Sequence, residues 1–240
     1  MKTAVILSGG LGTRLRPLTL EMPKALIPVQ GKSLTEQVID KVKESGVKTV
    51  YLSIGYMSDK IEEYFDKLDL GVKINYIVES EPLGTGGWMH KISLQQIEDD
   101  FSEDFIVVNG DNLFDLDWSE MMKVHSKNKS NVTIALTTVD DVSAYGVAAL
   151  KGEMIVRFVE KPIASEAPSN FINSGYYIFS PSIFDILPEK EKFSLEKEFF
   201  PIIAANKKLF GYKDEVSQWF DTGTFSRWER VINEWKNKLD

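Results

Sequence analysis

A chain of 240 residues, of which 43% are hydrophobic, can bury a large core, and we favour one domain over two small ones. Its formal net charge of −8 argues against nucleic acid as a partner, because proteins that bind the phosphate backbone present a basic face. The chain has no cysteine, which excludes disulfides and thiolate metal sites.

No membrane or export signal stands out in the sequence. No apolar run approaches the roughly 20 residues that span a bilayer. The N-terminus also lacks a charged segment followed by an apolar one and a cleavage site. We therefore expect a soluble, cytoplasmic protein.

Apolar runs rich in strand-forming residues alternate with segments of helical periodicity through the first part of the chain. The predicted strands are 3–7, 49–54, 73–77, 105–108 and 132–137. The predicted helices are 34–42, which begins after a Ser33 cap, and segments near 59–65, 86–96 and 119–127. Such alternation is typical of a mostly parallel sheet covered by helices.

The pattern changes after Tyr145. Two predicted strands, 146–150 and 155–159, flank Lys151-Gly152-Glu153 and indicate a hairpin, and 171–179 is a further strand. This part resembles an inserted, lid-like layer. The chain ends on an apolar stripe of helical spacing, which predicts a final helix whose tryptophans belong to the core: Phe225, Trp228, Val231, Ile232, Trp235 and Leu239.

A glycine-rich turn follows the first predicted strand. Gly9, Gly10 and Gly12 leave backbone N–H groups unshielded by Cβ, so these groups can converge on phosphate oxygens. The guanidinium of Arg14 can donate two hydrogen bonds to one phosphate. Lys24 lies in a segment predicted to be extended and adds a second cation. The spacing of glycines and cations predicts a polyphosphate site.

Other interpretations of this turn fit less well. A dinucleotide fingerprint counted from Gly10 would need a third glycine where the chain has Leu15. An ordinary tight turn between a strand and a helix would not require an arginine and a lysine at these distances.

Two aspartates are candidate ligands for a hard cation. Asp111 follows an apolar strand in Asn-Gly-Asp, and Asp221 lies in Trp-Phe-Asp-Thr-Gly-Thr. Carboxylate oxygens at such positions suit Mg²⁺. Asp111 could equally be a solvated turn residue, and Asp221, Thr222 or Thr224 could cap the final helix.

The candidate residues follow different strands of the predicted sheet. Open α/β sheets bind ligands beyond the carboxyl ends of their strands. Gly9 follows the first strand, the segment 79–87 follows the third, and Asp111 follows the fourth. We expect the three segments to line one crevice.

The order of these motifs resembles the sugar-1-phosphate nucleotidylyltransferases, also called nucleoside-diphosphate-sugar pyrophosphorylases. The matching motifs are G-G-x-G-T-R-L-x-P-L-T and P-K within 9–24, E-P-L-G-T-G-G at 81–87, N-G-D at 109–111, V-E-K-P at 159–162, N-S-G-Y-Y-I-F at 173–179 and F-D-T-G-T at 220–224. They span nearly the whole chain.

The resemblance implies a Rossmann-like, mostly parallel mixed sheet flanked by helices, with a smaller β-rich sugar-binding insertion and no C-terminal β-helix. We expect one nucleotidyltransferase domain over 1–240, with a nucleotide-binding half (1–140) and a half (141–240) that carries the sugar site and the C-terminal helix.

The resemblance also implies roles for individual residues. The catalytic cations are Arg14, Lys24 and Lys161, and the Mg²⁺ ligands are Asp111 and Asp221. The nucleotide-binding residues are Leu7, Gly9, Gly10, Gly12, Thr13, Glu79, Gly84 and Thr85. The sugar-binding residues are Asn109, Gly146, Glu160 and Asn173. Without the resemblance, a lysine beside a proline, as at Lys161, would more simply be a surface residue.

The implied reaction joins a nucleoside triphosphate to a sugar 1-phosphate and releases pyrophosphate. The Glu79 carboxylate could accept both adjacent N–H groups of the guanine edge, whereas the carbonyls that flank the single N–H of uracil or thymine would repel its second oxygen. The motif E-P-L-G-T-G-G also resembles that of guanylyltransferases that use mannose or heptose 1-phosphate, so the resemblance makes GTP with mannose 1-phosphate the leading pair. The alternatives are a uridylyl- or thymidylyltransferase that acts on a glucose-, heptose- or MurNAc-type sugar 1-phosphate.

Other classes of protein stay open at this point. A non-catalytic nucleotide-sugar sensor would be expected to lack one of the catalytic or metal-binding residues, and all are present. A nicotinamide-dependent oxidoreductase lacks support in the glycine pattern. We expect small-molecule partners, no nucleic acid and no membrane, and the oligomeric state is open, with a homodimer as one alternative.

Overall fold

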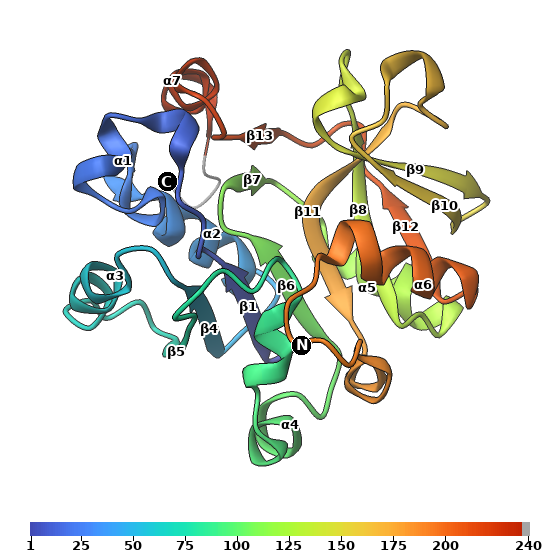
Figure 1. Ribbon diagram of the computed structural model, residues 1–240, viewed down its shortest axis with the longest axis horizontal. Helices are drawn as coiled ribbons and strands as arrows, with labels where there is room; N and C mark the ends of the chain where they lie inside the picture. The colour runs from blue at the N-terminus through green and yellow to red at the C-terminus, as the bar shows by residue number, and fades with distance from the viewer. Residues whose placement is uncertain (237–240) are drawn as a thin grey trace. The chain divides into compact units, whose positions relative to one another are not determined.

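The computed structural model describes residues 1–236 (Figure 1), so Leu239 of the predicted C-terminal stripe lies outside the described residues. The chain forms two compact units. Unit 1 comprises 1–82, 107–116 and the segment from 218 onward, and unit 2 comprises 83–106 and 117–217. The prediction of one domain over 1–240, with halves that meet at 140 and 141, stays a prediction.

The sheet of unit 1 has the strand order β5-β4-β1-β6. Its strands are β1 (Thr3–Leu7), β4 (Thr49–Ile54), β5 (Lys73–Val78) and β6 (Phe105–Asn109), of which β6 enters unit 1 at Val107. The β1–β4 and β4–β5 pairs are parallel. Residues 4–6 of β1 are fully buried, as expected for a strand covered on both faces. These four strands confirm the sequence predictions.

The helices of unit 1 are α1 (Leu18–Glu21), α2 (Leu34–Lys43), α3 (Ser58–Phe65) and α7 (Phe225–Glu234). Two short antiparallel pairs complete the unit: β2 (Pro28–Val29) with β3 (Lys32–Ser33), and β7 (Asn112–Phe114) with β13 (Trp219–Asp221). The predicted Ser33 cap is confirmed, because its hydroxyl accepts from the Glu36 N–H at 3.2 Å and Glu36 accepts from the Ser33 N–H at 2.7 Å. This reciprocal capping box fixes where α2 begins.

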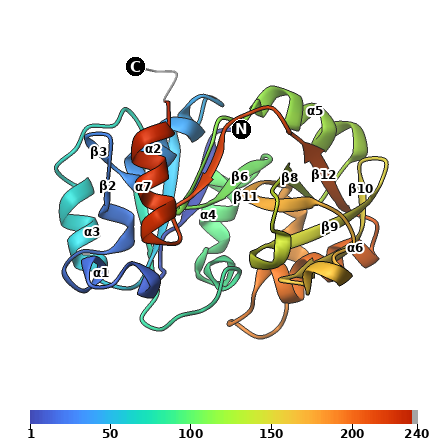
Figure 2. The ribbon, with the colours of Figure 1, turned by 90° about the horizontal axis from the view of Figure 1, so that it is seen from above.

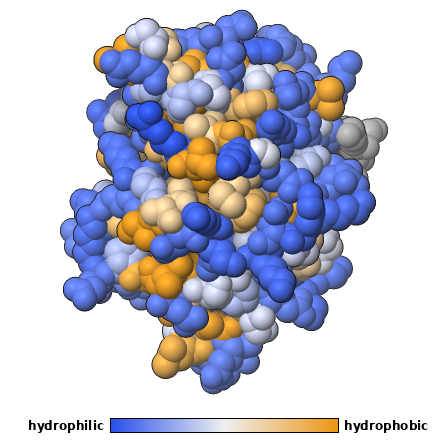
Figure 3. All heavy atoms as spheres, turned by 90° about the vertical axis from the view of Figure 1, so that its right-hand side faces the viewer, coloured by the Kyte–Doolittle hydropathy of each residue, from blue (hydrophilic) through white to orange (hydrophobic). Residues whose placement is uncertain are grey.

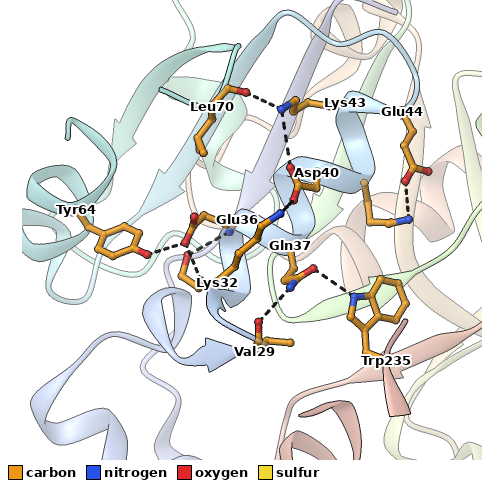
Figure 4. Close-up of polar contacts among 12 residues, drawn as sticks. Val29, Lys32, Glu36, Gln37, Asp40, Lys43, Glu44, Tyr64, Leu70 and Trp235 are labelled. Atoms are coloured by element: carbon orange, nitrogen blue, oxygen red, sulfur yellow. Dashed lines mark hydrogen bonds and ion pairs between the residues drawn. The ribbon is translucent and has the colours of Figure 1, made fainter. Parts of the chain in front are cut away.

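Helix α2 carries a buried polar network (Figure 4). The Gln37 amide donates to the Val29 carbonyl at 3.1 Å and accepts from the Trp235 indole at 3.3 Å. The Lys41 side chain is 1% exposed, and its ammonium lies 2.6 Å from Glu44 and 3.4 Å from Asp115. The bond from Trp235 joins the residue after α7 to α2.

The apolar stripe of α7 is only partly a core feature. Val231 and Trp235 are buried, but Phe225 is 41% and Ile232 36% exposed. Trp228 is half-buried and its indole donates to a backbone carbonyl at 2.9 Å. The prediction of a core role is confirmed for Trp235 and wrong for Trp228, because a partly exposed indole satisfies its N–H at the surface.

The strands of unit 2 are β8 (Val132–Thr138), β9 (Gly146–Lys151), β10 (Met154–Glu160), β11 (Phe171–Phe179) and β12 (Leu209–Lys213). Their order is β11-β8-β12-β10-β9, and β9 also pairs with β11. The β8–β12 pair is parallel, whereas the β9–β10, β8–β11 and β9–β11 pairs are antiparallel, so this sheet is mixed. The β9–β10 hairpin is confirmed, with Gly152 in the left-handed region at φ 65°.

Helices α5 (Trp118–Asn128) and α6 (Phe200–Ala205) lie on opposite sides of the unit 2 strands, as Figure 2 shows. Helix α4 (Leu94–Asp100) is shorter and begins later than predicted. The expected helix over 86–96 is wrong: a 3₁₀ turn covers Gly87–Lys91, and Ser93 then starts α4 with its own capping box. A strong cap in the middle of a periodic segment divides it into two elements.

Single turns connect the longer elements. The 3₁₀ turns are Thr13–Leu15, Lys24–Leu26, Val142–Ala144, Ala164–Glu166 and Pro181–Ile186, and Leu195–Phe199 is a π-helical turn before α6. Within residues 1–236, no helix combines the length and apolar character that crossing a membrane requires. The face in Figure 3 is mostly hydrophilic, with hydrophobic side chains gathered toward its middle.

The buried ammonium of Lys41 provides a test of this core. We expect Lys41→Ala to lower the free energy of unfolding by about 3 kcal/mol, because the change removes a buried partner of two carboxylates. Lys67→Ala removes an exposed i,i+4 pair with Glu63 and should cost less than about 0.5 kcal/mol. Urea denaturation measures both, and equal losses would contradict the structural role of Lys41.

Candidate active site

Three segments that follow strands meet at one edge of the unit 1 sheet. The Ser8 N–H donates to the Ser53 carbonyl at 2.8 Å, and the Glu79 N–H donates to the Ile54 carbonyl at 2.8 Å. The Gly110 N–H donates to the Leu7 carbonyl at 2.9 Å. The turn after β1, the residue after β5 and the turn after β6 are thus held beside one another, as the topology predicts.

The glycine turn after β1 presents its backbone to solvent. Gly10 is exposed, and within residues 1–236 the N–H groups of Gly9, Gly10 and Gly12 donate no hydrogen bond. Gly12 lies in the left-handed region at φ 60°, and a Cβ there would come within 2.9 Å of the Thr19 methyl group. The Thr19 hydroxyl also donates to the Gly12 carbonyl at 2.8 Å. The turn therefore has a fixed shape and open donors, which suits an anion.

The two candidate aspartates come together through the short β7–β13 pair. In that pair Asp221 lies opposite Asn112, the residue after Asp111. Thr222 donates to the Asp111 carbonyl from both its N–H, at 3.0 Å, and its hydroxyl, at 2.9 Å. The Asp111 side chain is 42% exposed and that of Asp221 is 8% exposed. Thr224, rather than Asp221, caps α7 by accepting from an N–H in its first turn.

Each of these carboxylates contacts a cation. The Lys24 ammonium lies 2.7 Å from Asp111, and the Arg227 guanidinium lies 2.7 Å from Asp221. Asp221 also accepts from the Gly223 N–H at 2.7 Å. A Cβ on Gly223 would lie 3.0 Å from the Arg14 guanidinium, so Arg14 belongs to the same cluster. A protein with a negative net charge thus places three cations, Arg14, Lys24 and Arg227, around the two aspartates of unit 1.

The charges of this cluster change the acidity of Asp111. The Asp111 side chain is 42% exposed, but the protein atoms around its carboxyl displace water, and this desolvation by itself would raise the pKa of Asp111. The ammonium of Lys24, through its charge and hydrogen bond, and the guanidinium of Arg14 outweigh desolvation and lower the pKa of Asp111 below its ordinary 3.8. The carboxylate is therefore ionised at neutral pH.

The carboxylates of Asp111 and Asp221 suit a divalent cation, but two side chains do not fill its coordination shell. Two carboxylates on adjoining strands supply the hard oxygens that Mg²⁺ prefers. Among residues 1–236, no group of three or more acidic, histidine or cysteine side chains is placed to hold a metal. A metal at Asp111 and Asp221 would therefore keep positions for water or for phosphate oxygens.

Glu79 and Asn109 also belong to unit 1. One oxygen of Glu79 accepts from the Ser53 hydroxyl at 2.8 Å, which orients the carboxylate. The side-chain carbonyl oxygen of Asn109 is buried and has no hydrogen-bond partner within residues 1–236. Such an orphaned acceptor at the end of a strand is uncommon and suits a ligand hydroxyl.

The predicted base-binding residues Gly84 and Thr85 lie in unit 2, in a segment that pairs with Phe193. The Phe193 N–H donates to the Leu83 carbonyl, and the Gly86 N–H donates to the Phe193 carbonyl, both at 3.0 Å. Gly84 adopts φ 81° and any Cβ there would collide with the Phe193 carbonyl. This position requires glycine, and its backbone is exposed.

Gly146 and Glu160, two of the predicted sugar-binding residues, lie on the β9–β10 hairpin. Gly146 pairs with Glu160, and a Cβ on Gly146 would lie 2.9 Å from the Glu160 carboxylate. The Lys161 ammonium lies 3.2 Å from Glu160, its side chain is 62% exposed, and its backbone is left-handed at φ 50°. Burial raises the pKa of Glu160, although Lys161 opposes that effect.

Asn173 is buried in β11, and its side-chain amide forms hydrogen bonds within the protein. Its NH₂ group donates to the Tyr177 hydroxyl at 2.9 Å, and its carbonyl oxygen accepts from the Gly175 N–H at 2.9 Å. The side chain is thus already hydrogen-bonded at both ends, which the sequence could not reveal.

Sequence reasoning missed two side chains of this region, Arg227 and Glu196. Arg227 gave no signal because its ion pair depends on how α7 packs. Glu196 lies in the π-helical turn and accepts from the Thr85 hydroxyl at 2.6 Å. A different string, Gly31-Lys32-Ser33, looks like the end of a phosphate loop but is structural: Lys32 pairs with Asp40 at 2.7 Å and Ser33 caps α2.

Comparison with known proteins agrees with this arrangement. Residues 3–238 match the family described as nucleotidyl transferase. The chain is 36% identical to mannose-1-phosphate guanylyltransferase of Mycobacterium tuberculosis, over 92% of this chain and 61% of that relative. It is also 36% identical to D-glycero-alpha-D-manno-heptose 1-phosphate guanylyltransferase of Aneurinibacillus thermoaerophilus, over 87% of this chain and 88% of that protein.

A solved structure shares the fold. The crystal structure of HddC from Yersinia pseudotuberculosis complexed with GMP-PN superposes with a TM-score of 0.79 at 30% identity, covering 98% of this chain and 100% of that one. The predicted Rossmann-like α/β class is confirmed, and residues 1–236 contain no C-terminal β-helix. The chain spans 61% of the length of the Mycobacterium relative.

The Lys24–Asp111 pair predicts a pH effect. In Lys24→Met, the pKa of Asp111 should rise, because desolvation then acts against less positive charge. A carboxyl with a lowered folded pKa stabilises the fold above its unfolded pKa, and that stability is lost as pH falls through the folded value. The wild type should therefore exceed Lys24→Met in stability at neutral pH, and the difference should shrink in acid.

Carboxyl ¹³C NMR titration in buffer with a chelator measures the Asp111 pKa directly. Lys32→Met is the matched control, since it removes a 2.7 Å ion pair with Asp40 on a different element. An Asp111 pKa that is unchanged in Lys24→Met would contradict the assignment.

Proposed function

Because the chain belongs to the nucleotidyl transferase family, we propose that it transfers a nucleoside monophosphate from a nucleoside triphosphate to a sugar 1-phosphate, with release of pyrophosphate. The observation that carries the proposal is the cluster of Lys24, Asp111 and Asp221 beside Arg14 in unit 1. It combines cations for phosphates with carboxylates for a metal ion. The open amides of the glycine turn add further donors.

The chemical step is a displacement at the α-phosphorus. An oxygen of the sugar 1-phosphate forms the new P–O bond, and the bond to the pyrophosphate oxygen breaks. The attacking oxygen is already ionised, so no general base is required. Positioning and charge neutralisation then supply the rate.

Repulsion between the two anionic substrates is the barrier that the protein must offset. Two unit charges about 4 Å apart repel by roughly 4 kcal/mol at an effective dielectric near 20. We assign Arg14 and the backbone of 9–13 to the triphosphate, and Lys24 and Lys161 to the phosphates that react. The Lys161 side chain of unit 2 is 62% exposed, so an anion can reach its ammonium from solvent although the ammonium pairs with Glu160 at 3.2 Å.

Asp111 and Asp221 are the proposed metal ligands. The family generally uses a divalent metal, and we propose Mg²⁺, which supplies positive charge at the α-phosphate when bound. The chain's own contribution is to keep the Asp111 carboxylate ionised and to place Asp221 on the strand that pairs with the residues after Asp111. Thr222, which bonds the backbone of Asp111, holds the two strands together.

For the base we propose guanine, read by Glu79 with Leu7, Gly84 and Thr85. The relatives named as guanylyltransferases and the HddC complex with GMP-PN support this choice. For the sugar we propose mannose 1-phosphate, with a manno-heptose 1-phosphate as second candidate, because one relative of 36% identity is named for that substrate. Gly146, Glu160, Asn109 and Asn173 are the proposed sugar contacts, of which Asn109 has the unused acceptor.

The remaining assignments are narrower proposals. We propose no nucleic-acid or membrane partner, a cytoplasmic location, and either a monomer or a homodimer. A nucleotide-sugar sensor without turnover is the alternative outside enzymes, and pyrophosphate release separates the two.

The substrate proposal is tested by a grid of four nucleoside triphosphates against mannose, glucose and manno-heptose 1-phosphates with Mg²⁺. We expect GTP with mannose 1-phosphate to give the fastest pyrophosphate release. Activity confined to UTP or dTTP would overturn the guanine assignment. Tight binding of a nucleotide sugar without any turnover would favour the sensor.

Asp111 provides the test of the metal assignment. Asp111→Asn should lower kcat by at least about 100-fold, because one charged oxygen donor to the cation is lost. Folding should persist, since Thr222 bonds the Asp111 backbone rather than its side chain. Glu63→Gln changes an exposed carboxylate that pairs with Lys67 and serves as the control. A near-normal rate in Asp111→Asn would remove this residue from the metal site.

A further inference from the structure

The π-helical turn Leu195–Phe199 of unit 2 is joined to the segment 83–86 that carries the proposed base contacts. The backbone pairing of Leu83 and Gly86 with Phe193 brings the two segments side by side. Gly84 and Thr85 lie between these two anchors. Single π-helical turns recur at functional sites, which makes this turn a candidate for a role beyond packing.

One carboxylate links the turn to the segment. The Thr85 hydroxyl donates to Glu196 Oε2 at 2.6 Å and accepts from the Leu195 N–H at 2.9 Å. The Ser194 hydroxyl donates to the same Glu196 oxygen at 2.7 Å. Thr85 therefore uses its hydroxyl both as donor and as acceptor, and a hydrogen bond to a carboxylate is of the stronger kind.

The residues around Thr85 explain why such a link is needed. Gly84 lies in the left-handed region at φ 81°, and Gly86 packs its backbone directly against the Phe193 ring. Neither glycine has a side chain that could hold the segment in place, and glycine loses more conformational freedom on ordering than any other residue. Thr85 is the one residue of the three that can fix the position of the exposed Gly84 backbone.

The charge of Glu196 also acts on Glu160, one of the proposed sugar contacts. Burial raises the pKa of Glu160 first, and the negative charge of Glu196 raises it further, while Lys161 and Lys197 lower it. Within residues 1–236, Glu196 forms no hydrogen bond or ion pair with Gly146, Glu160 or Lys161. Its hydrogen bonds go to Thr85 and Ser194.

We propose that Glu196 is a positioning residue for the nucleotide: through Thr85 it holds Gly84 in the conformation that receives the base. The inference rests on the proposed function, because it takes 84–85 as base contacts. Glu196 itself touches no reacting atom and is not a catalytic residue. Its loss should weaken nucleotide binding and leave the chemical step at saturation largely intact.

The test compares Glu196→Ala with the conservative Glu196→Gln, using the nucleoside triphosphate that the wild type uses best. In Glu196→Ala the KM for that nucleotide should rise about 10-fold, the size expected for losing a charge-assisted hydrogen bond. The kcat and the KM for the sugar 1-phosphate should change less than about 3-fold. Glu196→Gln keeps a side-chain carbonyl that can accept from Thr85, and should restore the nucleotide KM to within about 3-fold.

Variants of Thr85, which donates to Glu196, test the same link if Glu196→Ala fails to fold. Thr85→Val removes the hydroxyl at equal volume and should raise the nucleotide KM, whereas Thr85→Ser retains the hydroxyl and should not. The double variant Thr85→Val/Glu196→Ala should bind the nucleotide no more weakly than Thr85→Val alone, because that change already removes the link to Glu196 together with the bond from the Leu195 N–H. Ser194→Ala is the control: it removes the other donor to the same oxygen and the acceptor of the Lys197 N–H, but no hydrogen bond to the 84–86 segment.

The outcomes separate this inference from the proposed function. If the wild type releases no pyrophosphate with any substrate pair, the proposed function fails. If the wild type is active and Glu196→Ala leaves the nucleotide KM unchanged, the positioning role is overturned. A fall in kcat alone, or a rise in the sugar 1-phosphate KM alone, would also overturn it, since either would place Glu196 in the chemistry or at the sugar.

Discussion

The ion pair between Lys24 and Asp111 is the contact on which the unit 1 site depends. At 2.7 Å it keeps the carboxylate ionised despite desolvation by the surrounding protein, and it holds an ammonium beside the strand end where the proposed phosphates would react. The chain as a whole carries a net charge of −8, so an anionic substrate must find its cations in one place. Arg14 and Arg227 add to that local positive charge.

The sheet of unit 1 explains how residues from three segments become neighbours. Parallel strands end at a common edge, so the turns after β1 and β6 and the residue after β5 share hydrogen bonds there. The β7–β13 pair then adds Asp221, which lies 110 positions after Asp111 and accepts from Arg227 on α7. A single short ladder thus supplies the second carboxylate, and α7 holds it in place.

In unit 2, hydrogen bonds fix the conformation of the segment 83–86, which contains the exposed Gly84. Backbone pairing with Phe193 anchors both ends of that segment, and the Glu196–Thr85 bond fixes its centre. The hairpin of β9 and β10 places Gly146 against Glu160 by close approach. Both devices use glycine for proximity and a carboxylate for orientation, which is consistent with recognition of a polar, hydroxyl-rich ligand.

The sequence by itself determined the long strands, the start of α2, the β9–β10 hairpin and the glycine turn with its cations, because apolar runs, caps and turn residues act over a few neighbours. It misjudged 86–96, where Ser93 begins a new helix, and Trp228, whose exposure depends on how α7 packs. Only the tertiary structure decided that Arg227 pairs with Asp221, that the Asn173 amide is already hydrogen-bonded, and that Glu196 reaches Thr85. Those contacts join side chains whose meeting is set by packing and strand pairing, and no local pattern encodes such distances.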